Sequence, residues 1–276
     1  MSIQLGYLWT CGASAVRMAD PVNPGSEMGI THRILFPIFM IIIQINDGGN
    51  CDLIEGIEGI YTKKDKAVIT RDWESQFKEF KKYKPLTISN RVGPLVMNIM
   101  LKMSRAGNFY TPVLYVHNLC REFPCFTMTL RCKAGIVSPE QHNKIYIDEA
   151  IKVKNESYIP VNGDITIDTV IEGYERYFKN PIMDSYLDYE DLVLFCGWTG
   201  QADKIEYTLK LVYKELKKWP QERFFSQSGG FVNWFQQLEK NAWEGDLLNK
   251  IYEAEYKKHK CEKIPEREII LLKGDH

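Results

Sequence analysis

One short segment of the sequence carries the residue types that bind zinc. His117, Cys120, Cys125 and Cys132 supply one imidazole and three thiols, a donor set found in tetrahedral zinc sites. Their spacing, H-x2-C-x4-C-x6-C, lacks the closely spaced C-x2-C pair that makes such a site recognisable. Cys132 also fits the alternation of a strand whose inward face is apolar. The sequence therefore predicts no metal ligand here.

Cys196 is the one cysteine whose position resembles that of a nucleophile. It follows an apolar run, residues 192–195, which we expect to be a strand, and it precedes an expected helix. A catalytic thiol needs a base beside it on an exposed turn, and no local signature supplies one. The chain also lacks a Gly-x-Ser-x-Gly elbow and a glycine-rich phosphate loop. No catalytic residue is predicted.

Two groups of carboxylates lie close together in the sequence. Asp188, Glu190 and Asp191 form one group, and Asp148 and Glu149 form the other. Such groups serve nucleases and glycosidases, but they are equally typical of a solvated surface. An intracellular enzyme that uses the thiol described above or a carboxylate cluster is therefore an alternative.

A lysine-rich segment suggests a third kind of function. Lys78, Lys81, Lys82 and Lys84 could contact phosphates, with aromatic residues nearby, as in a viral nucleic-acid-binding protein. The whole chain has a formal net charge of −1, which provides no general attraction to nucleic acid. We therefore interpret these lysines as a solvated face.

The elements expected around these residues begin with a strand at 38–45, a turn at 47–49 and a helix at 71–84. Thr70 is the expected cap of that helix, and Trp73, Phe77 and Phe80 form its apolar stripe. Further strands are expected at the following places: 91–103 (or a buried helix), 113–116, 126–132, and two short strands joined by a hairpin turn at 162–164.

The last third of the sequence has helical periodicity. Helices are predicted at 202–216, 231–243 and 247–258, the last capped by Asp246, and an apolar tail at 269–272 suits an edge strand. The predicted fold class is therefore α+β, with strands in the first two-thirds and helices concentrated in the C-terminal third. Residues 1–31 are predicted to be an N-terminal arm, and 32–276 a single compact domain.

Seven cysteines without a regular spacing indicate free thiols in a reducing compartment. The N-terminus lacks the charged and apolar regions of a signal peptide, and the apolar run at 34–45 is too short to cross a bilayer. We expect a cytoplasmic protein without a membrane partner.

Two stretches of the chain resemble cypovirus polyhedrin. The first stretch, 41–83, has a strand, the Asp-Gly-Gly turn at 47–49, a second strand, and a final segment that ends with the sequence FKEFKKY. The second stretch, 113–141, has strands that lead to the sequences KA at 133–134 and VSPE at 137–140. The resemblance implies an antiparallel β-sandwich with attached helices, assembled as trimers, with a helix at 8–18 reaching between copies. It also implies a structural protein without enzymatic activity, whose crystals dissolve in alkali; some members bind nucleotides.

The leading prediction is therefore a viral structural protein that self-assembles into a polyhedrin-like occlusion-body crystal around virus particles. Its partners would be copies of itself, as a homotrimer with further lattice contacts, and virus particles, with no specific nucleic acid. It would need no cofactor and would lie in occlusion bodies in the cytoplasm of the infected host cell. The 15 tyrosines would lose their protons near pH 10, which suits dissolution in alkali.

Overall fold

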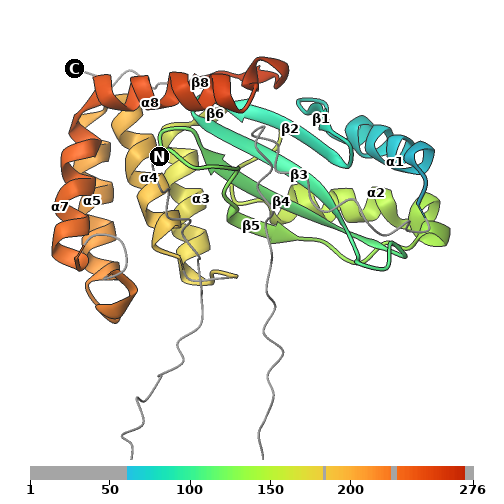
Figure 1. Cartoon of the computed structure of the whole chain (residues 1–276), viewed down its shortest axis with the longest axis horizontal. Coiled ribbons are helices and arrows are strands. Elements are labelled where there is room, and N and C mark those ends of the chain that lie inside the picture. The colour runs from blue at the N-terminus through green and yellow to red at the C-terminus, as the bar shows by residue number, and fades with distance from the viewer. Residues whose placement is uncertain (1–60, 183–184, 225–228, 271–276) are drawn as a thin grey trace, which may run out of the picture. The chain divides into compact units, whose positions relative to one another are not determined.

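The computed structural model describes residues 61–182, 185–224 and 229–270. Within them one antiparallel sheet is flanked by helices, and a cluster of further helices continues the core beyond one end of the sheet (Figure 1). The predicted arm at 1–31, the strand at 38–45 and the turn at 47–49 lie outside the described residues.

The main sheet has six strands in the order β1-β2-β3-β4-β5, and β7 pairs with β2 in parallel. All the other neighbours in this sheet are antiparallel. The central pair, β3 and β4, has an unbroken register from Leu95↔Asn118 to Met103↔Tyr110. The strands are β1 (Lys81–Lys84), β2 (Thr87–Val92), β3 (Leu95–Met103), β4 (Tyr110–Asn118), β5 (Thr129–Lys133) and β7 (Glu266–Arg267).

The predicted β-sandwich is wrong. The α+β composition and the antiparallel pairing are present, but strands β1 to β5 lie in the middle of the chain, and the segments that follow them are mainly helical. Apart from the main sheet, the described residues form only a two-stranded parallel sheet of β6 (Ile165–Thr166) and β8 (Ile269–Ile270). The sheet therefore packs against helices and not against a second large sheet.

The expected hairpin around 162–164 is replaced by two helices. Helix α2 (Pro139–Glu156) begins with a proline in its first turn, which is favourable there, and buries Ala150 and Val153 against the core. Helix α3 (Ile167–Lys179) follows β6 and is capped by Thr166, whose hydroxyl accepts from the Thr169 N–H. The polar residues that alternate with apolar ones in this region therefore lie on the exposed sides of helices.

The helix expected at 71–84 overlaps the observed one only in part, because the observed helix both begins and ends eight residues earlier. Helix α1 (Lys63–Gln76) begins at Thr62, where Thr62 and Asp65 form a reciprocal capping box. Thr70 is not the cap; it is buried in the middle of α1 and donates its hydroxyl to the Lys66 carbonyl. The helix ends at Gln76, and after a short turn Lys81–Lys84 form β1, whose lysines protect the edge of the sheet.

The run at 192–195, expected to be a strand, belongs to helix α4 (Tyr186–Thr199). The helix packs against α3, α5, α7, α8 and β5. An apolar run in a helix that is surrounded in this way faces the core on every side. Periodicity therefore cannot distinguish such a run from a buried strand.

The helices of the last third confirm the sequence prediction closely. Helices α5 (Ala202–Leu216) and α7 (Phe231–Trp243) have the predicted bounds, and α8 (Gly245–Lys258) begins two residues before the prediction, with Glu244 at the N-cap position in place of Asp246. Ile269 and Ile270 of the predicted tail form β8. In the described part of the chain, no helix has the length and apolar character needed to span a membrane.

Candidate functional site

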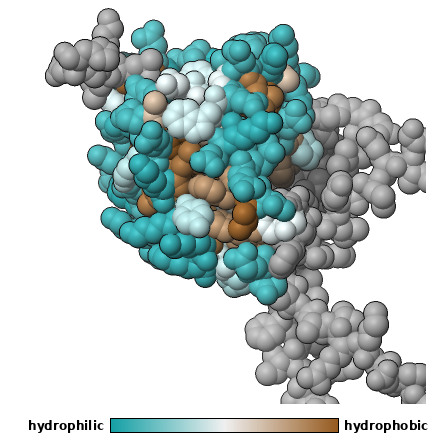
Figure 2. Space-filling model, turned by 90° about the vertical axis from the view of Figure 1, so that its left-hand side faces the viewer, coloured by the Kyte–Doolittle hydropathy of each residue, from teal (hydrophilic) through white to brown (hydrophobic). Residues whose placement is uncertain are grey.

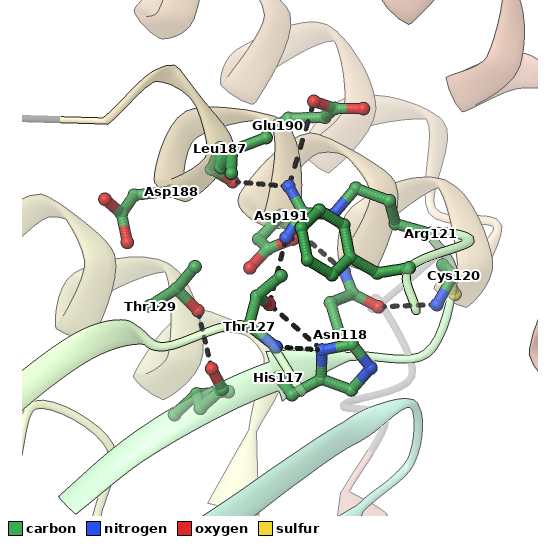
Figure 3. Close-up of polar contacts among 12 residues, drawn as sticks. His117, Asn118, Cys120, Arg121, Thr127, Thr129, Leu187, Asp188, Glu190 and Asp191 are labelled. Atoms are coloured by element: carbon green, nitrogen blue, oxygen red, sulfur yellow. Dashed lines mark hydrogen bonds and ion pairs between the residues drawn. The ribbon is translucent and has the colours of Figure 1, made fainter. Parts of the chain in front are cut away.

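A buried ionic cluster lies where the end of β4 meets the first turns of α4 (Figure 3). The Arg121 guanidinium, which follows β4, lies 2.9 Å from the Asp191 carboxylate and 3.8 Å from that of Glu190. Asp191 is fully buried and Arg121 nearly so. This site is therefore the strongest concentration of charge inside the described protein.

Local sequence explains how these groups meet. Ser185 caps α4 by accepting from the Leu187 N–H, so that the acidic residues that follow lie in the first turns, where the helix dipole favours negative charge. Asn118 at the end of β4 donates from its side-chain amide to the Asp191 carbonyl at 2.8 Å and accepts from the Cys120 N–H. These bonds fasten α4 to β4.

Asp188 lies beside this ion pair and has a different environment. It is buried and accepts from the Leu130 N–H at 3.2 Å, and Leu130 has a left-handed φ of 48°. Burial, together with the negative charge of Asp191, raises the pKa of Asp188 to about 8. Asp188 is therefore protonated at neutral pH. Burial also raises the pKa of Asp191, to about 7, and the Arg121 guanidinium opposes that rise, so that Arg121 balances the negative charge of Asp191 and of the partly exposed Glu190.

Thr127 links the ionic cluster to His117 on β4. Its hydroxyl accepts from Arg121 at 3.1 Å and lies 2.9 Å from Nδ1 of His117, which also accepts from the Thr127 N–H. Burial, with positive charges nearby, holds the pKa of His117 well below its usual range. The His117 ring is therefore neutral, with Nδ1 as an acceptor.

The cluster contains acids and a base, and within the described residues its charged groups are buried apart from the partly exposed Glu190. An open depression of about 700 Å³ lies on the molecule at the junction of α4, α7 and α8, lined by Trp198, Trp243 and Lys250 among others, and none of the cluster residues lines it. Catalysis by acid and base requires contact with the reacting group. The geometry instead suits a structural ion network that joins α4 to the sheet.

A second buried relay connects α1, β4 and α2. The Trp73 indole N–H donates to the Tyr110 hydroxyl at 3.0 Å; that hydroxyl lies 2.8 Å from Nδ1 of His142, and Nε2 of His142 lies 3.2 Å from Asp72. Every member of this chain has a partner, and Tyr110 is fully buried. This relay fixes the packing of the two helices on the sheet.

The structure places Cys196 in the centre of the helical cluster. Its side chain is fully buried, and burial raises the pKa of the thiol to about 12. A thiol in this state is neither ionised at neutral pH nor accessible. Cys196 therefore lacks both properties that a nucleophile requires.

The other candidates from the sequence also take structural positions. Cys132 lies 3.8 Å from the Glu156 carboxylate. Of the second acidic pair, Glu149 is buried and accepts from the Gly135 N–H, whereas Asp148 is exposed. The lysines proposed for nucleic acid, Lys78, Lys81, Lys82 and Lys84, are all exposed, and the last three lie on β1.

His117, for which no metal site was predicted, lies beside two other potential ligands. Among the residues that the structure describes, the only group of three or more with metal-ligand geometry is His117, Glu255 and His259, and it includes none of the cysteines that were considered and rejected on sequence. Glu255 and His259 are four residues apart at the end of α8, a spacing that places them on one side of a helix. That spacing was a usable signal, but nothing in the sequence connects it to His117.

Comparisons with known proteins give no further guide to identity. No protein family matches the chain, and neither a curated protein nor a solved structure matches it.

Proposed function

We propose that this protein is a structural protein that associates with copies of itself through two different apolar surfaces. The observation that carries the proposal is the exposure of large apolar side chains on α2 and on α7. Exposed apolar groups that gather on one face mark sites of protein contact more often than scattered ones do.

The first surface, here called the α2 face, contains Ile147 and Ile151. Each is 45% exposed, and they lie four residues apart, so that they form one ridge along the helix. Ile136, which is 60% exposed, precedes the same helix. Three exposed isoleucines near one helix have no role in the core of the monomer.

The second surface, the α7 face, contains Val232 and Trp243. They are 61% and 48% exposed and are separated by three helical turns, which places both on the same side of α7. Tyr213 of α5 is also exposed and packs beside Phe235, with ring centroids 5.0 Å apart. Figure 2, which views the molecule from the side of α5 and α7, shows apolar side chains gathered within a hydrophilic surround.

The α2 face and the α7 face differ in shape, and this difference determines how one copy would pack against the next. The α2 face is a ridge of branched side chains, whereas Trp243 borders the depression of about 700 Å³ that Trp198 and Leu247 also line. In Figure 1, α2 and α7 lie at opposite ends of the folded part. A ridge that fits a recess elsewhere on the next copy gives a head-to-tail contact, which forms a closed ring or an open filament according to the rotation between copies.

The near-zero net charge of the chain is compatible with such packing, because copies repel one another weakly. The occlusion-body crystal is the specific form of assembly that the resemblance to polyhedrin suggests. The β-sandwich is not part of this proposal.

The test is sedimentation of the purified chain and of two double variants. Ile147→Lys/Ile151→Lys removes the α2 face, and Val232→Lys/Trp243→Lys removes the α7 face. We expect the unmodified chain to form large species and each double variant to be monomeric. An equimolar mixture of the two variants should form a dimer, because each retains the face that the other lacks.

Gln141→Lys is the matched control, since it adds a charge on α2 at an exposed position away from the two isoleucines. It should assemble like the unmodified chain. A monomeric unmodified chain at high concentration would rule out self-assembly. Dimers in each variant alone, with no gain on mixing, would contradict the head-to-tail arrangement.

A further inference from the structure

The end of α8 meets β4 at a cluster of three potential metal ligands. His117, Glu255 and His259 each offer one ligand atom, and these atoms lie within 4.8 Å of one another. His117 and Glu255 are buried, and His259 is only slightly exposed. Two imidazoles and one carboxylate are a common protein ligand set for zinc.

His117 provides the observation that points to a ligand. Its ring is fully buried, and Nδ1 is held by the N–H of Thr127 at 3.0 Å. Its other nitrogen, Nε2, has no hydrogen-bond partner within the described ranges. A buried polar atom without a partner costs about 1–3 kcal/mol, so such atoms are uncommon unless something binds them.

The two residues of α8 are already arranged beside one another. Nε2 of His259 lies 3.1 Å from Oε2 of Glu255, while Oε1 of Glu255 accepts from Lys258 at 2.8 Å. The Phe126 ring packs against both imidazoles, with centroid distances of 4.8 Å to His117 and 4.6 Å to His259. Lys258 and Phe126 therefore orient the cluster. Oε2 of Glu255 is the oxygen on the side of the His259 imidazole, where it also accepts from the Phe123 N–H at 3.4 Å.

We propose that His117, Glu255 and His259 bind a zinc ion. Ligand atoms about 2.0–2.2 Å from a tetrahedral ion lie roughly 3.3 Å apart, so the cluster needs only rotation of side chains to close on the metal. The nitrogen-rich donor set favours zinc over magnesium or calcium, which prefer oxygen ligands. Three protein ligands leave the fourth position to water.

Binding through Nε2 of His117 requires a change of tautomer. With Nδ1 as an acceptor, the ring proton is on Nε2. In the metal-bound ring the proton moves to Nδ1, which then gives up the hydrogen bond from the Thr127 N–H and donates to the Thr127 hydroxyl, 2.9 Å away. A metal-bound histidine commonly donates its other N–H to such a partner. Thr127 therefore has a positioning role, and it connects the proposed zinc site to Arg121.

The zinc ion would join residues that are far apart in the sequence. It would fasten the C-terminal end of α8 to the central sheet through β4, so that binding energy contributes to folding. This role does not depend on self-assembly, because none of the three residues belongs to the α2 face or the α7 face.

The experiment is titration of the metal-free full chain with zinc chloride in competition with a chromogenic chelator. We expect one zinc per chain and a rise in the melting temperature on binding. Cobalt chloride gives a second readout, because tetrahedral cobalt with nitrogen and oxygen ligands absorbs visible light more strongly than hexa-aqua cobalt does. Both measurements use the protein without any assay of activity.

His259→Gln and Glu255→Gln each remove one ligand at the end of α8, and we expect them to weaken zinc binding at least tenfold. Glu262→Gln is the matched control, because this exposed carboxylate lies nearby and outside the cluster. Circular dichroism confirms that each variant is folded. The proposal is overturned if the unmodified chain takes up no stoichiometric zinc, or if both ligand variants bind zinc as tightly as the control does.

Discussion

The guanidinium of Arg121 lies 2.9 Å from the carboxylate of Asp191, and both groups are buried where α4 meets β4. Arg121 belongs to the segment after β4, and Asp191 to the second turn of α4, seventy residues later in the chain. The pair is thus a long-range contact that holds the helical cluster on the sheet. Its energetics follow from burial, since neither charge can be solvated by water if its partner is lost.

Replacing Arg121 alone should destabilise the fold strongly. Arg121→Met leaves Asp191 as an uncompensated buried charge, and we expect a loss of about 3–5 kcal/mol in the free energy of unfolding. The double variant Arg121→Met/Asp191→Leu should recover a large part of this loss, because both charges are then absent. Urea denaturation followed by circular dichroism measures each value.

The control for this pair is an ion pair on the surface. Lys210 and Glu206 lie 3.3 Å apart on α5 with well-exposed side chains, so Lys210→Met should cost less than about 1 kcal/mol. A cost for Arg121→Met no larger than that of the surface variant would show that the buried cluster does not hold α4 to the sheet.

The contribution of Asp188 to the stability of the protein should fall as the pH rises from about 4 to about 8. The pKa of Asp188 is raised by burial from 3.8 to about 8, so the folded state binds a proton in this range that the unfolded state has released. The contribution of this group is complete below its unfolded pKa and is lost as the pH passes through the folded one.

Asp188→Asn isolates that effect, because the amide resembles the protonated acid and can still accept from the Leu130 N–H. The variant should lose less stability than the unmodified chain between pH 4 and pH 8, in urea denaturation at each pH. Equal slopes for the two proteins would mean that Asp188 is not protonated in the folded state.

Two partly buried tyrosines, Tyr83 and Tyr252, produce a separate loss of stability in alkali. Burial raises the pKa of Tyr83 and of Tyr252 from 10 to about 12, so the unfolded state loses these protons first. Stability should fall from pH 10 up to about pH 12, with absorbance at 295 nm reporting ionisation of the phenols. Phenol ionisation complete by pH 10 in the folded protein would contradict this assignment.

The sequence was sufficient to predict those helices that bury only one of their faces. The apolar residues of α5 and α7 recur at helical spacing because only one side of each helix meets the core, and both helices have the predicted bounds. In α4 the same rule fails, since the helix is enclosed and its apolar run has no period. Helix α2 was not predicted, because it buries only a narrow stripe of side chains and most of its residues are polar.

The candidate site is formed by contacts between segments that are distant in the sequence, and no local sequence pattern predicts such contacts. Asp188, Glu190 and Asp191 stand out in the sequence, but Arg121 is an unremarkable residue after a strand, and only the fold brings the two segments together. His117 was considered on sequence only as a ligand beside three cysteines, and that site was rejected on its spacing. Its neighbours Glu255 and His259 come from a helix more than a hundred residues away, and their meeting depends on how α8 packs at the end of β4.

Gly197 should be intolerant of any side chain, because α4 and α7 approach closely there. A Cβ atom at this position would lie 2.6 Å from the Ala242 carbonyl oxygen and 2.8 Å from a methyl group of Leu248. We expect Gly197→Ala to cost about 1–3 kcal/mol, as overpacking of a core usually does. Gly245→Ala is the control, since a Cβ atom there meets nothing within 4 Å, and its stability should equal or exceed that of the unmodified chain. Thermal denaturation that ranks the two variants in the opposite order would refute the close approach.

Cys196 should react with thiol reagents only when the protein opens. Its side chain is fully buried, and burial raises its pKa to about 12, so the reactive thiolate is both scarce and shielded at pH 8. Alkylation by iodoacetamide, followed by mass spectrometry of the peptide that contains Cys196, should be slow in the folded protein. In increasing urea the rate should follow the fraction of unfolded chain, because opening of the helical cluster exposes α4. Rapid modification of Cys196 in the folded protein at pH 8, with the remaining structure intact by circular dichroism, would instead restore this thiol as a candidate nucleophile.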